Sequence, residues 1–155
     1  SLTSNWEQIM NINGILFPTD FSHTGDKALA MAESLARDSG AKIFIVHVEE
    51  PPTAYGGGEM YYGMLEPDLE HLKALLSKVK PKDPQIEYEQ HMVTGEPAEA
   101  IARFAEENDV DIVVMGTHGR TGLMRLLMGS VAEAVVRRSK CAVLTVKPAE
   151  ESEGE

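Results

Sequence analysis

The chain has 155 residues, of which 43% are hydrophobic and 25% are charged, so its length suits one domain and its composition lies near the globular average. These values exclude disordered, collagen-like and coiled-coil proteins. The formal net charge of -11 argues against nucleic acid as a partner, because most of the surface would repel a polyanion. No membrane partner is expected, since no window approaches about eighteen consecutive apolar residues. Residues 1–13 lack the pattern of a secretory signal, which predicts a cytoplasmic location.

Short apolar runs alternate with amphipathic helical patterns throughout the chain. Continuous apolar runs are typical of strands buried on both faces, whereas apolar residues spaced three or four apart indicate one face of a helix. In chain order, the predicted elements are a strand at 15–17, a helix at 25–39, a strand at 41–48, a helix at 65–79, a strand at 86–92, a helix at 95–105, a strand at 111–115, a helix at 130–138 and a strand at 141–146. The strand at 86–92 alternates apolar and charged residues, which predicts a sheet edge with one solvated face.

This order of elements predicts the α/β class. Apolar strands joined by helical crossovers form a doubly wound, Rossmann-like parallel sheet, here of five strands with helices on both faces. No internal repeat or linker divides the chain, so one domain is expected at 1–148. Residues 149–155 are acidic and lack apolar anchors, which predicts a solvated tail.

Two of the predicted strand ends carry residues suited to binding. In doubly wound sheets, ligands bind beyond the carboxyl ends of the strands, where the winding reverses direction. Thr19 and Asp20 follow the first strand, and a glycine-rich segment at 116–120 follows the fourth and leads to Gly129 and Ser130. Glycines let backbone amides approach an anion, and a helix start adds N–H groups without partners.

A small anion with an apolar body would suit this part of the chain. Residues 110–147 carry a local charge of +4 within the acidic sequence, as an anion site would need. A helix start contributes only about 0.3 to 2 kcal/mol to binding of one anion, so further contacts are needed. Val46 and Val48, at the end of the second strand, could form an apolar wall for a purine ring.

The glycine spacing is similar to that of a known family. Gly116, two residues, Gly119, nine residues, Gly129 and then Ser130 is the pattern that identifies the ATP-binding branch of the universal stress protein family. The chain resembles that branch, and the resemblance extends to the ends of the first two strands and to the last apolar strand. The chain departs from the family mainly in the Gly- and Tyr-rich segment at 55–63.

The resemblance implies an adenine nucleotide alpha hydrolase-like fold that binds ATP, with AMP or ADP as alternative ligands and magnesium carried on the phosphates. Asp20 would contact the ribose, Val48 would border the adenine, and Arg120 would lie at the phosphates. The residues expected at the nucleotide are Pro18, Thr19, Asp20, Val46, Val48, Met115, Gly116, His118, Gly119, Arg120, Gly129, Ser130 and Val131. The resemblance also implies a homodimer through the last strand, Ala142 to Val146, and a protein partner of unknown identity.

Some of these residues also have structural interpretations. The first two glycines of the pattern could form an ordinary turn, and Asp20 could cap the first helix. Ser130 and Glu133 have the spacing of a capping box, in which each side chain bonds the other's backbone amide. The five histidines lack the spacing of metal ligands, so no protein metal site is predicted. Cys141 is predicted to be an inert buried thiol.

Three functions are compatible with these patterns. The main hypothesis is an ATP-binding regulatory protein, because the chain lacks a Walker A lysine and an obvious general base. The enzymatic alternative is slow ATP hydrolysis or autophosphorylation, with Asp20 or His118 orienting the nucleophile. The third is a structural dimer that binds no nucleotide, against which the intact glycine spacing argues.

Overall fold

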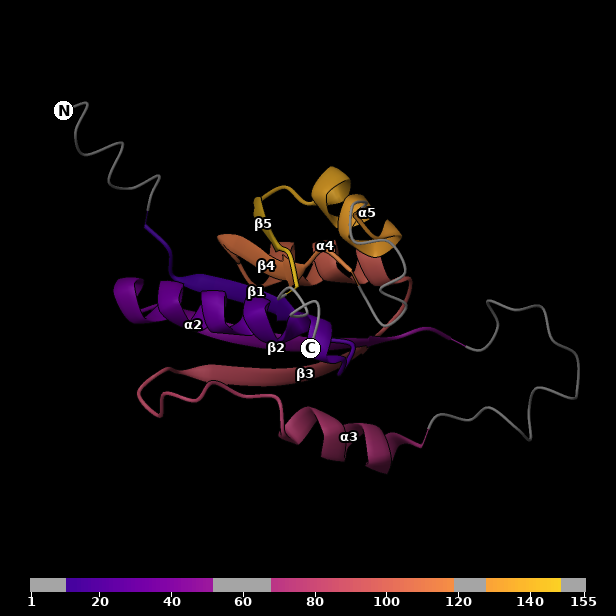
Figure 1. Cartoon of the computed structure of the whole chain (residues 1–155). Helices are drawn as coiled ribbons and strands as arrows, with labels where there is room; N and C mark the ends of the chain where they lie inside the picture. Colours follow the sequence, from indigo (N-terminus) through magenta and orange to yellow (C-terminus); the bar gives the residue numbers. More distant parts are fainter. Residues whose placement is uncertain (1–10, 52–67, 119–127, 149–155) are drawn as a thin grey trace, which may run out of the picture.

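A five-stranded sheet forms the centre of the molecule (Figure 1). The computed structural model describes residues 11–51, 68–118 and 128–148. The strands are β1 (Gly14–Pro18), β2 (Lys42–Glu49), β3 (Tyr88–Thr94), β4 (Ile112–Gly116) and β5 (Ala142–Val146). All neighbouring strands are parallel, and their order across the sheet is β3-β2-β1-β4-β5. The predicted α/β class with a five-stranded parallel sheet is confirmed.

Helices connect these strands, and residues that favour helix ends bound two of them. The helical elements are η1 (His23–Gly25), α2 (Asp26–Ser39), α3 (Leu69–Ser77), α4 (Pro97–Glu107) and α5 (Ser130–Arg138). Gly40 ends α2 in the left-handed region, with φ 76°, and its N–H donates to the carbonyl of Ala36. Pro97 begins α4 after Glu96, whose carboxylate accepts from two N–H groups of the first turn. None of the helices within the described ranges has the length and apolar character needed to cross a bilayer.

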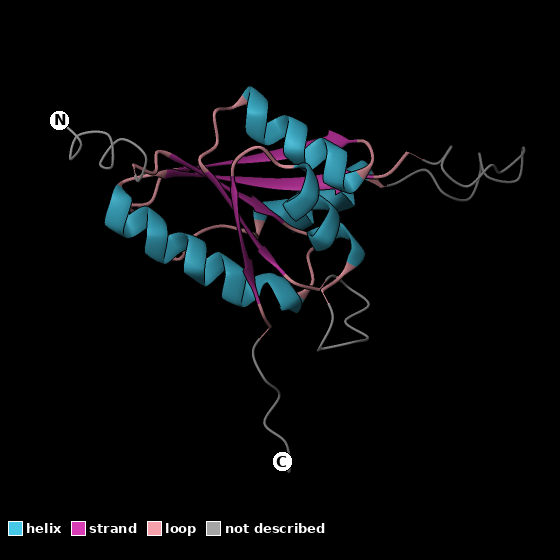
Figure 2. Ribbon diagram, turned by 90° about the horizontal axis from the view of Figure 1, so that it is seen from above, coloured by secondary structure: helices cyan, strands magenta, loops and turns pink. Residues whose placement is uncertain are grey.

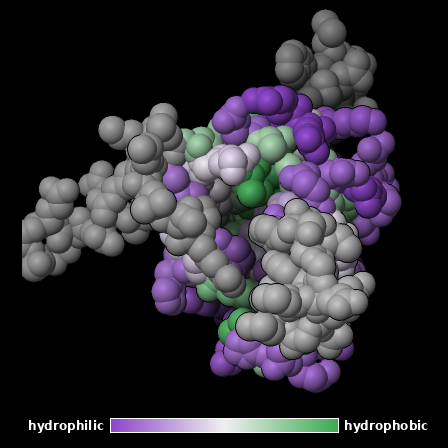
Figure 3. All heavy atoms as spheres, turned by 90° about the vertical axis from the view of Figure 1, so that its right-hand side faces the viewer, coloured by the Kyte–Doolittle hydropathy of each residue, from purple (hydrophilic) through white to green (hydrophobic). Residues whose placement is uncertain are grey.

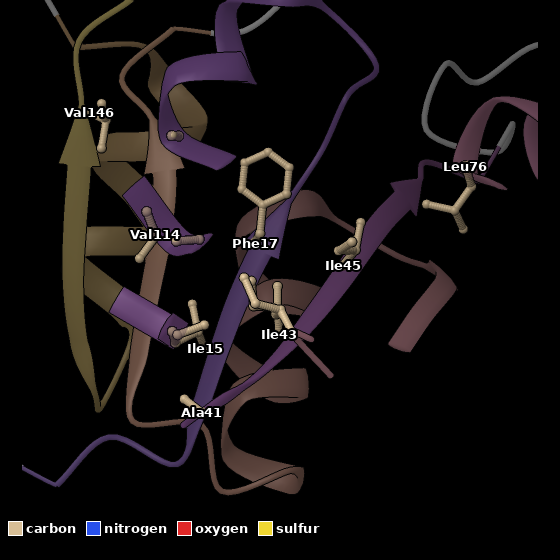
Figure 4. Close-up of a cluster of buried hydrophobic side chains, with 12 residues drawn as sticks. Ile15, Phe17, Ala41, Ile43, Ile45, Leu76, Val114 and Val146 are labelled. Atoms are coloured by element: carbon tan, nitrogen blue, oxygen red, sulfur yellow. The ribbon is translucent and has the colours of Figure 1, made fainter. Parts of the chain in front are cut away.

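Helices cover both faces of the sheet (Figure 2). One core lies between the sheet and helices α2 and α3, and it includes Ile15 and Phe17 of β1 (Figure 4). The second core lies under α4 and α5 and includes Leu16 of β1 and Val46 of β2. Successive residues of a strand point to opposite faces, so Ile15 and Leu16 belong to different cores. Burial on both faces explains why the strands are continuous apolar runs.

The winding of the chain reverses beside β1. The chain passes from β1 to β2 and β3 on one side, and then crosses to β4 and β5 on the other. β1 and β4 are neighbours whose connections leave in opposite directions, so their carboxyl ends border the switch point of the sheet. β3 and β5 form the two edges of the sheet. The edge position of β3 agrees with the prediction from its alternating pattern. The edge position of β5 is what a dimer through the last strand would require.

The third strand differs from its prediction at 86–92. β3 begins and ends two residues later, and Ile86 lies in a buried turn where its N–H donates to the carbonyl of Asp83 at 3.2 Å. The face predicted to be solvated is only partly so, with the side chains of Glu89 and His91 39% and 37% exposed. The ring of His91, on that face, lies 5.0 Å from the ring of Phe104 of α4. The charged alternation therefore marks an edge strand whose faces are both partly covered.

The helix predicted at 65–79 is shorter in the structure. α3 begins after Asp68, whose carboxylate accepts a hydrogen bond from the N–H of His71 at 3.1 Å, and it ends at Ser77. Val79 lies beyond the helix but still packs against the core, which explains its place in the apolar stripe. Pro67, predicted in the first turn, lies outside the described residues, as does the acidic tail at 149–155. The domain boundary at 148 stays a prediction.

Candidate functional site

A cavity opens at the carboxyl ends of β1, β2 and β4, at the switch point of the sheet. Its volume is about 330 Å³. Small-molecule sites span about 300 to 1,000 Å³, so the cavity is large enough to hold a small ligand. Figure 3 looks toward the side of the molecule to which the strand ends point, and hydrophobic residues lie there among hydrophilic ones.

The backbone of β1 stays paired with β2 beyond the last residue of the strand. The N–H of Thr19 donates to the carbonyl of Val46 at 2.8 Å. The carbonyl of Thr19 lies 2.8 Å from Nδ1 of His47, whose Nε2 lies 2.5 Å from Oε1 of Glu49. Both backbone polar groups of Thr19 are therefore bonded to β2, which fixes the start of the following loop beside the cavity.

Side-chain hydrogen bonds shape the loop after β1. The carboxylate of Asp20 accepts from the N–H of Ser22 at 2.9 Å and from its hydroxyl at 2.5 Å. The hydroxyl of Ser22 also lies 2.6 Å from Oγ1 of Thr24. Asp20 thus stabilises the turn at the cavity wall, a common role of aspartate. The alternative that Asp20 caps the first helix is wrong, since α2 has Gly25 as its N-cap residue.

The chain leaves β4 and returns to the same place at the start of α5. The N–H of Thr117 donates to the carbonyl of Val146 at 3.1 Å, which extends the pairing of β4 with β5 by one residue. The carbonyl of Thr117 accepts from the N–H of Gly129 at 2.7 Å. This second bond anchors the first turn of α5 beside the end of β4, so both belong to one cavity wall.

The first turn of α5 presents backbone N–H groups. Gly129 is the N-cap residue, and no side chain caps the helix within the described residues. The predicted capping box is wrong, because Ser130 is already helical and the carboxylate of Glu133 pairs with Arg137. The first intrahelical bond runs from the N–H of Glu133 to the carbonyl of Gly129 at 3.0 Å. The N–H groups of the three residues before Glu133 therefore lack intrahelical acceptors, as suits an anion site.

Gly116 permits a close approach between β4 and the loop after β1. A Cβ at this position would lie 3.2 Å from the carbonyl oxygen of Thr24 and 3.5 Å from that of His118. The first distance is shorter than an ordinary contact between these atoms, and close-packed interiors have little room to yield. Glycine at this position therefore lets the loop after β1 and the end of β4 border one cavity.

His118 has one satisfied and one unsatisfied ring nitrogen. Its Nδ1 lies 2.9 Å from Oγ1 of Thr117, whereas its Nε2 is buried and has no hydrogen-bond partner among the residues that the structure describes. Leaving a buried polar atom unpaired costs about 1 to 3 kcal/mol, which a ligand group bonding Nε2 would recover. Metal binding by the protein has no comparable support: residues 11–51, 68–118 and 128–148 contain no group of three or more His, Cys, Asp or Glu that could hold a metal ion.

Apolar side chains supply another part of the cavity wall. Val46 and Met115 are buried, and Val48 is half-buried beside them in the core under α4 and α5. Helix α4 adds Pro97 and Ile101, which lie one turn apart on the same face. The cavity thus combines an apolar wall with backbone N–H donors, an arrangement that suits a ligand with a flat apolar ring and an anionic group.

The basic residues of the last third contribute less to the cavity than their number suggests. Three of them pair with carboxylates of α4 or α5. The pairs are Arg137 with Glu133, Arg138 with Glu96 and Lys140 with Glu106. None of these three basic residues lines the cavity. Within the described residues, an anion bound there would contact backbone N–H groups and not these three basic side chains.

Cys141 lies away from this cavity. It borders a second, smaller hollow of about 220 Å³ with Lys140 and Glu106. Burial raises the pKa of the Cys141 thiol above its ordinary value, which lowers the fraction of reactive thiolate. Cys141 is half-buried and not fully buried as predicted, whereas its raised pKa is consistent with the predicted low reactivity.

The structure brings together the predicted binding residues that it describes. These residues, which all line the cavity, are Pro18, Thr19, Asp20, Val46, Val48, Met115, Gly116, His118, Gly129, Ser130 and Val131. Gly119 and Arg120 lie outside the described residues. The lining residues to which the sequence assigned no role are Thr24, Gly25, His47, Pro97, Ile101, Thr117 and Ala132. Thr117 lies within the glycine pattern and His47 precedes Val48, so proximity to these segments was the available signal.

Comparison with known proteins shows the family. The sequence model of the universal stress protein family matches residues 11–147. Universal stress protein MJ0531 of Methanocaldococcus jannaschii is 35% identical over 140 residues, which cover 86% of this chain and 81% of that protein. The solved structure of the hypothetical protein MJ0577 has a TM-score of 0.72 at 29% identity and covers 92% of this chain and 100% of its own.

A further solved structure contains a ligand. A universal stress protein solved in complex with cAMP has a TM-score of 0.60 at 26% identity, covering 90% of this chain and 99% of that one. Its fold and that of MJ0577 agree with the five-stranded parallel sheet described above. The family match, the relatives and the fold lead to one conclusion: the chain belongs to the universal stress protein family.

Proposed function

We propose that this chain binds an adenine nucleotide, with ATP as the main ligand, in the cavity at the ends of β1, β2 and β4. The observation that carries the proposal is the anchoring of the first turn of α5 by the bond from Gly129 to Thr117, next to an apolar wall that includes Val46. A relative with 26% identity was solved with cAMP, which is also an adenine nucleotide. Nucleotide occupancy would then regulate contacts with a protein partner.

The cavity suggests how the nucleotide would lie. The purine would pack against Val46, Val48 and Ile101, and Asp20 would face the ribose. The phosphates would accept hydrogen bonds from the first turn of α5, and Gly119 and Arg120 would add contacts there. Micromolar affinity needs about 8 kcal/mol, and a helix start supplies only about 0.3 to 2 kcal/mol, so the apolar contacts must contribute most of it. AMP and ADP are therefore alternative ligands, because they share the base and ribose.

Magnesium would be carried by the phosphates. The ion demands octahedral oxygen ligands and usually keeps several waters, so it often binds through substrate phosphates and one or two carboxylates. Asp20 is the carboxylate that lines the cavity. No further protein ligand is required by this arrangement.

Two measurements test the proposed function. Mass spectrometry of the protein purified under native conditions should detect a co-purified adenine nucleotide. Titration calorimetry of the nucleotide-free protein with Mg-ATP should then show saturable heat, and bound ligand should raise the melting temperature. Neither heat nor a thermal shift at millimolar nucleotide would overturn the proposal and favour the structural dimer that binds no nucleotide.

One observation favours a second function, slow hydrolysis or autophosphorylation. Nε2 of His118 is buried, has no partner within the described part of the chain and belongs to a residue that lines the cavity, so it could bond a phosphate or a water. Phosphate release that tracks the protein through purification and is lost in His118→Gln would support this activity. Release that tracks a contaminating ATPase and is unchanged in the variant would exclude it.

The open edge at β5 supports the proposal of a homodimer through Ala142–Val146. β5 pairs with β4 on one side and forms an edge of the sheet. Unpaired edge strands with apolar side chains tend to pair with a second chain. Ala142 is exposed, so Ala142→Lys should leave the fold intact and convert a dimer to a monomer in sedimentation analysis. A dimer of unchanged stability in this variant would exclude pairing through β5.

The cytoplasmic location stays a prediction.

A further inference from the structure

His47 is a buried histidine between two hydrogen-bond acceptors. Its side chain is 8% exposed. Nδ1 lies 2.8 Å from the carbonyl oxygen of Thr19, and Nε2 lies 2.5 Å from Oε1 of Glu49. A carbonyl accepts only, and an ionised carboxylate also accepts only. Both ring nitrogens must therefore donate. This requires the imidazole of His47 to carry a second proton while Glu49 is ionised.

The neutral ring cannot make both contacts with an ionised Glu49. If Nδ1 donates to Thr19, the lone pair of Nε2 faces the carboxylate, and the two repel. If Nε2 donates to Glu49, the lone pair of Nδ1 faces the carbonyl of Thr19. Charge-assisted hydrogen bonds are shorter and about twice as strong as neutral ones, which agrees with the short contact to Glu49. The extra proton is what holds the two contacts together.

The loop that borders the cavity depends on the same ring. Phe21 has φ 69°, in the left-handed region that side chains other than glycine rarely adopt. Its ring stacks on His47 with centroids 4.2 Å apart, and its N–H donates to Oγ1 of Thr19 at 3.1 Å. A strained backbone conformation persists when surrounding contacts hold it. His47 therefore holds the loop through its hydrogen bond to Thr19 and through its stacking on Phe21.

We infer that protonated His47 is a positioning residue for nucleotide binding: it ties the loop of Thr19 and Phe21 to Glu49 of β2 and so makes the affinity fall as the pH rises. The inference rests on the proposed function and adds a pH-dependent regulation to the same site. Thr19 and Asp20 line the cavity on this loop, so release of the loop would displace one wall.

Other titratable groups border this region and must be separated from His47. Asp20 lies on the loop after β1 and accepts two hydrogen bonds from Ser22, and His118 follows β4 and lines the same cavity. On β3, the residue opposite His47 in the register is Met92, which carries no charge. Glu49 is the charged group in contact with the ring. A pH effect at this cavity is therefore assigned to His47 only when variants of its neighbours are compared.

The test uses cAMP as the probe, because its phosphodiester stays singly ionised between about pH 6 and pH 9, unlike the terminal phosphate of ATP or AMP. Calorimetry of the wild-type protein should show the affinity falling about tenfold across this range, the size expected for loss of one charge-assisted contact. Glu49→Gln should bind with little pH dependence, since an amide can accept from a charged ring or donate to a neutral one. A flat wild-type profile would overturn the inference.

Two further variants separate positioning from general damage. His47→Phe keeps the ring that stacks on Phe21 but can bond neither Thr19 nor Glu49, so its affinity should be no higher than that of the wild type at high pH and should not change with pH. His118→Gln should keep the wild-type dependence. Loss of the dependence in His118→Gln, with its retention in His47→Phe, would assign the effect to His118 and overturn the inference.

Nuclear magnetic resonance of the free protein tests the protonation of His47 without any bound nucleotide. The nitrogen shifts of the His47 ring should show both nitrogens protonated at the acidic end of the range used for binding, and the amide signals of Thr19 and Phe21 should move when the proton is lost. Absence of cAMP and ATP binding at every pH would refute the proposed function, and the positioning role with it, even if these signals move. Binding without any coupling to the ring signals would refute the positioning role alone.

Discussion

The backbone N–H of Gly129 lies 2.7 Å from the carbonyl oxygen of Thr117 and donates a hydrogen bond to it, although the two residues are twelve positions apart. Thr117 is in turn bonded to Val146 of β5. The start of α5 is therefore attached to the sheet by the backbone itself, and its position does not depend on a side chain. This attachment places the N–H groups of the first turn at the switch point of the sheet.

Gly129→Val should weaken nucleotide binding with little loss of stability. Gly129 has φ -65° and ψ 158°, which valine adopts without strain, but the new side chain would stand where phosphates are expected. Loss of one charge-assisted bond costs about 1.5 to 3 kcal/mol, so calorimetry should show affinity reduced about tenfold or more. Val136→Ala, on the exposed face of the same helix, is the control and should bind normally. Equal affinity in both variants would contradict the placement of the phosphates.

Gly116→Ala should lower both stability and affinity. The added methyl group would meet the carbonyl oxygen of Thr24 at 3.2 Å, and relieving such overpacking costs about 1 to 3 kcal/mol. Gly14→Ala is the matched control at the other end of the sheet, because its methyl group would lie 3.5 Å from the ring of Phe44, an ordinary contact. Urea unfolding should show a lower midpoint for the first variant alone. Similar midpoints for the two variants would show that the loop of Thr24 yields freely.

Glu33→Ala should destabilise the fold without affecting the cavity. Glu33 of α2 is 7% exposed, and its carboxylate accepts from the N–H of Lys82 at 2.7 Å and of Asp83 at 3.3 Å. Removing it leaves two part-buried N–H donors without their charged acceptor, which costs about 1 to 3 kcal/mol. Asp38→Ala, an exposed change on the same helix, should have little effect. Nucleotide affinity measured below the melting temperature should equal that of the wild type in both proteins.

Glu89→Gln should change how stability depends on pH. A hydrogen bond from Lys42 and a second from His91 hold the pKa of Glu89 below its ordinary value of 4.5, so ionised Glu89 stabilises the fold. This contribution is present above the ordinary value and is lost as the pH falls through the lowered one. The wild type should therefore exceed the variant in urea midpoint at neutral pH, and the two should converge in acid.

The ion pair of Lys42 and Glu89 also determines how the stability of the fold changes at alkaline pH. The contact with Glu89 raises the pKa of Lys42 above 10.5, so the contribution of the pair is present below that value and is lost as the pH rises through the raised one. Added salt should reduce the difference between wild type and Glu89→Gln, because the pair is near the surface. Glu87→Gln, which removes a weaker attraction to Lys42, should show a smaller difference at every pH. A larger effect of Glu87→Gln than of Glu89→Gln on the urea midpoint would contradict the assignment of the alkaline behaviour to the pair of Lys42 and Glu89.

Local patterns predicted the elements whose signal is contained in a short stretch of chain. The runs around Ile15 and Val113 read as strands because both faces of a central strand are buried, and Gly40 marked the end of α2 because it alone there accepts the left-handed conformation. The same reasoning failed for Ser130, since a capping box and a helix that starts one residue earlier, at Ser130 itself, share one pattern. It also misplaced Ile86, whose apolar character reflects a buried turn.

The amino-acid sequence by itself determined the class of the fold, the order of its elements and a set of residues at two strand ends, because periodicity and glycine spacing are local properties. Their predicted contacts with nucleotide stay predictions. The tertiary structure decided which distant residues share the cavity: Pro97 and Ile101 of α4 and Thr24 of η1 carry no local mark of it. They meet because parallel strands bring their carboxyl ends to one edge of the sheet, and that proximity exists only after the chain has folded.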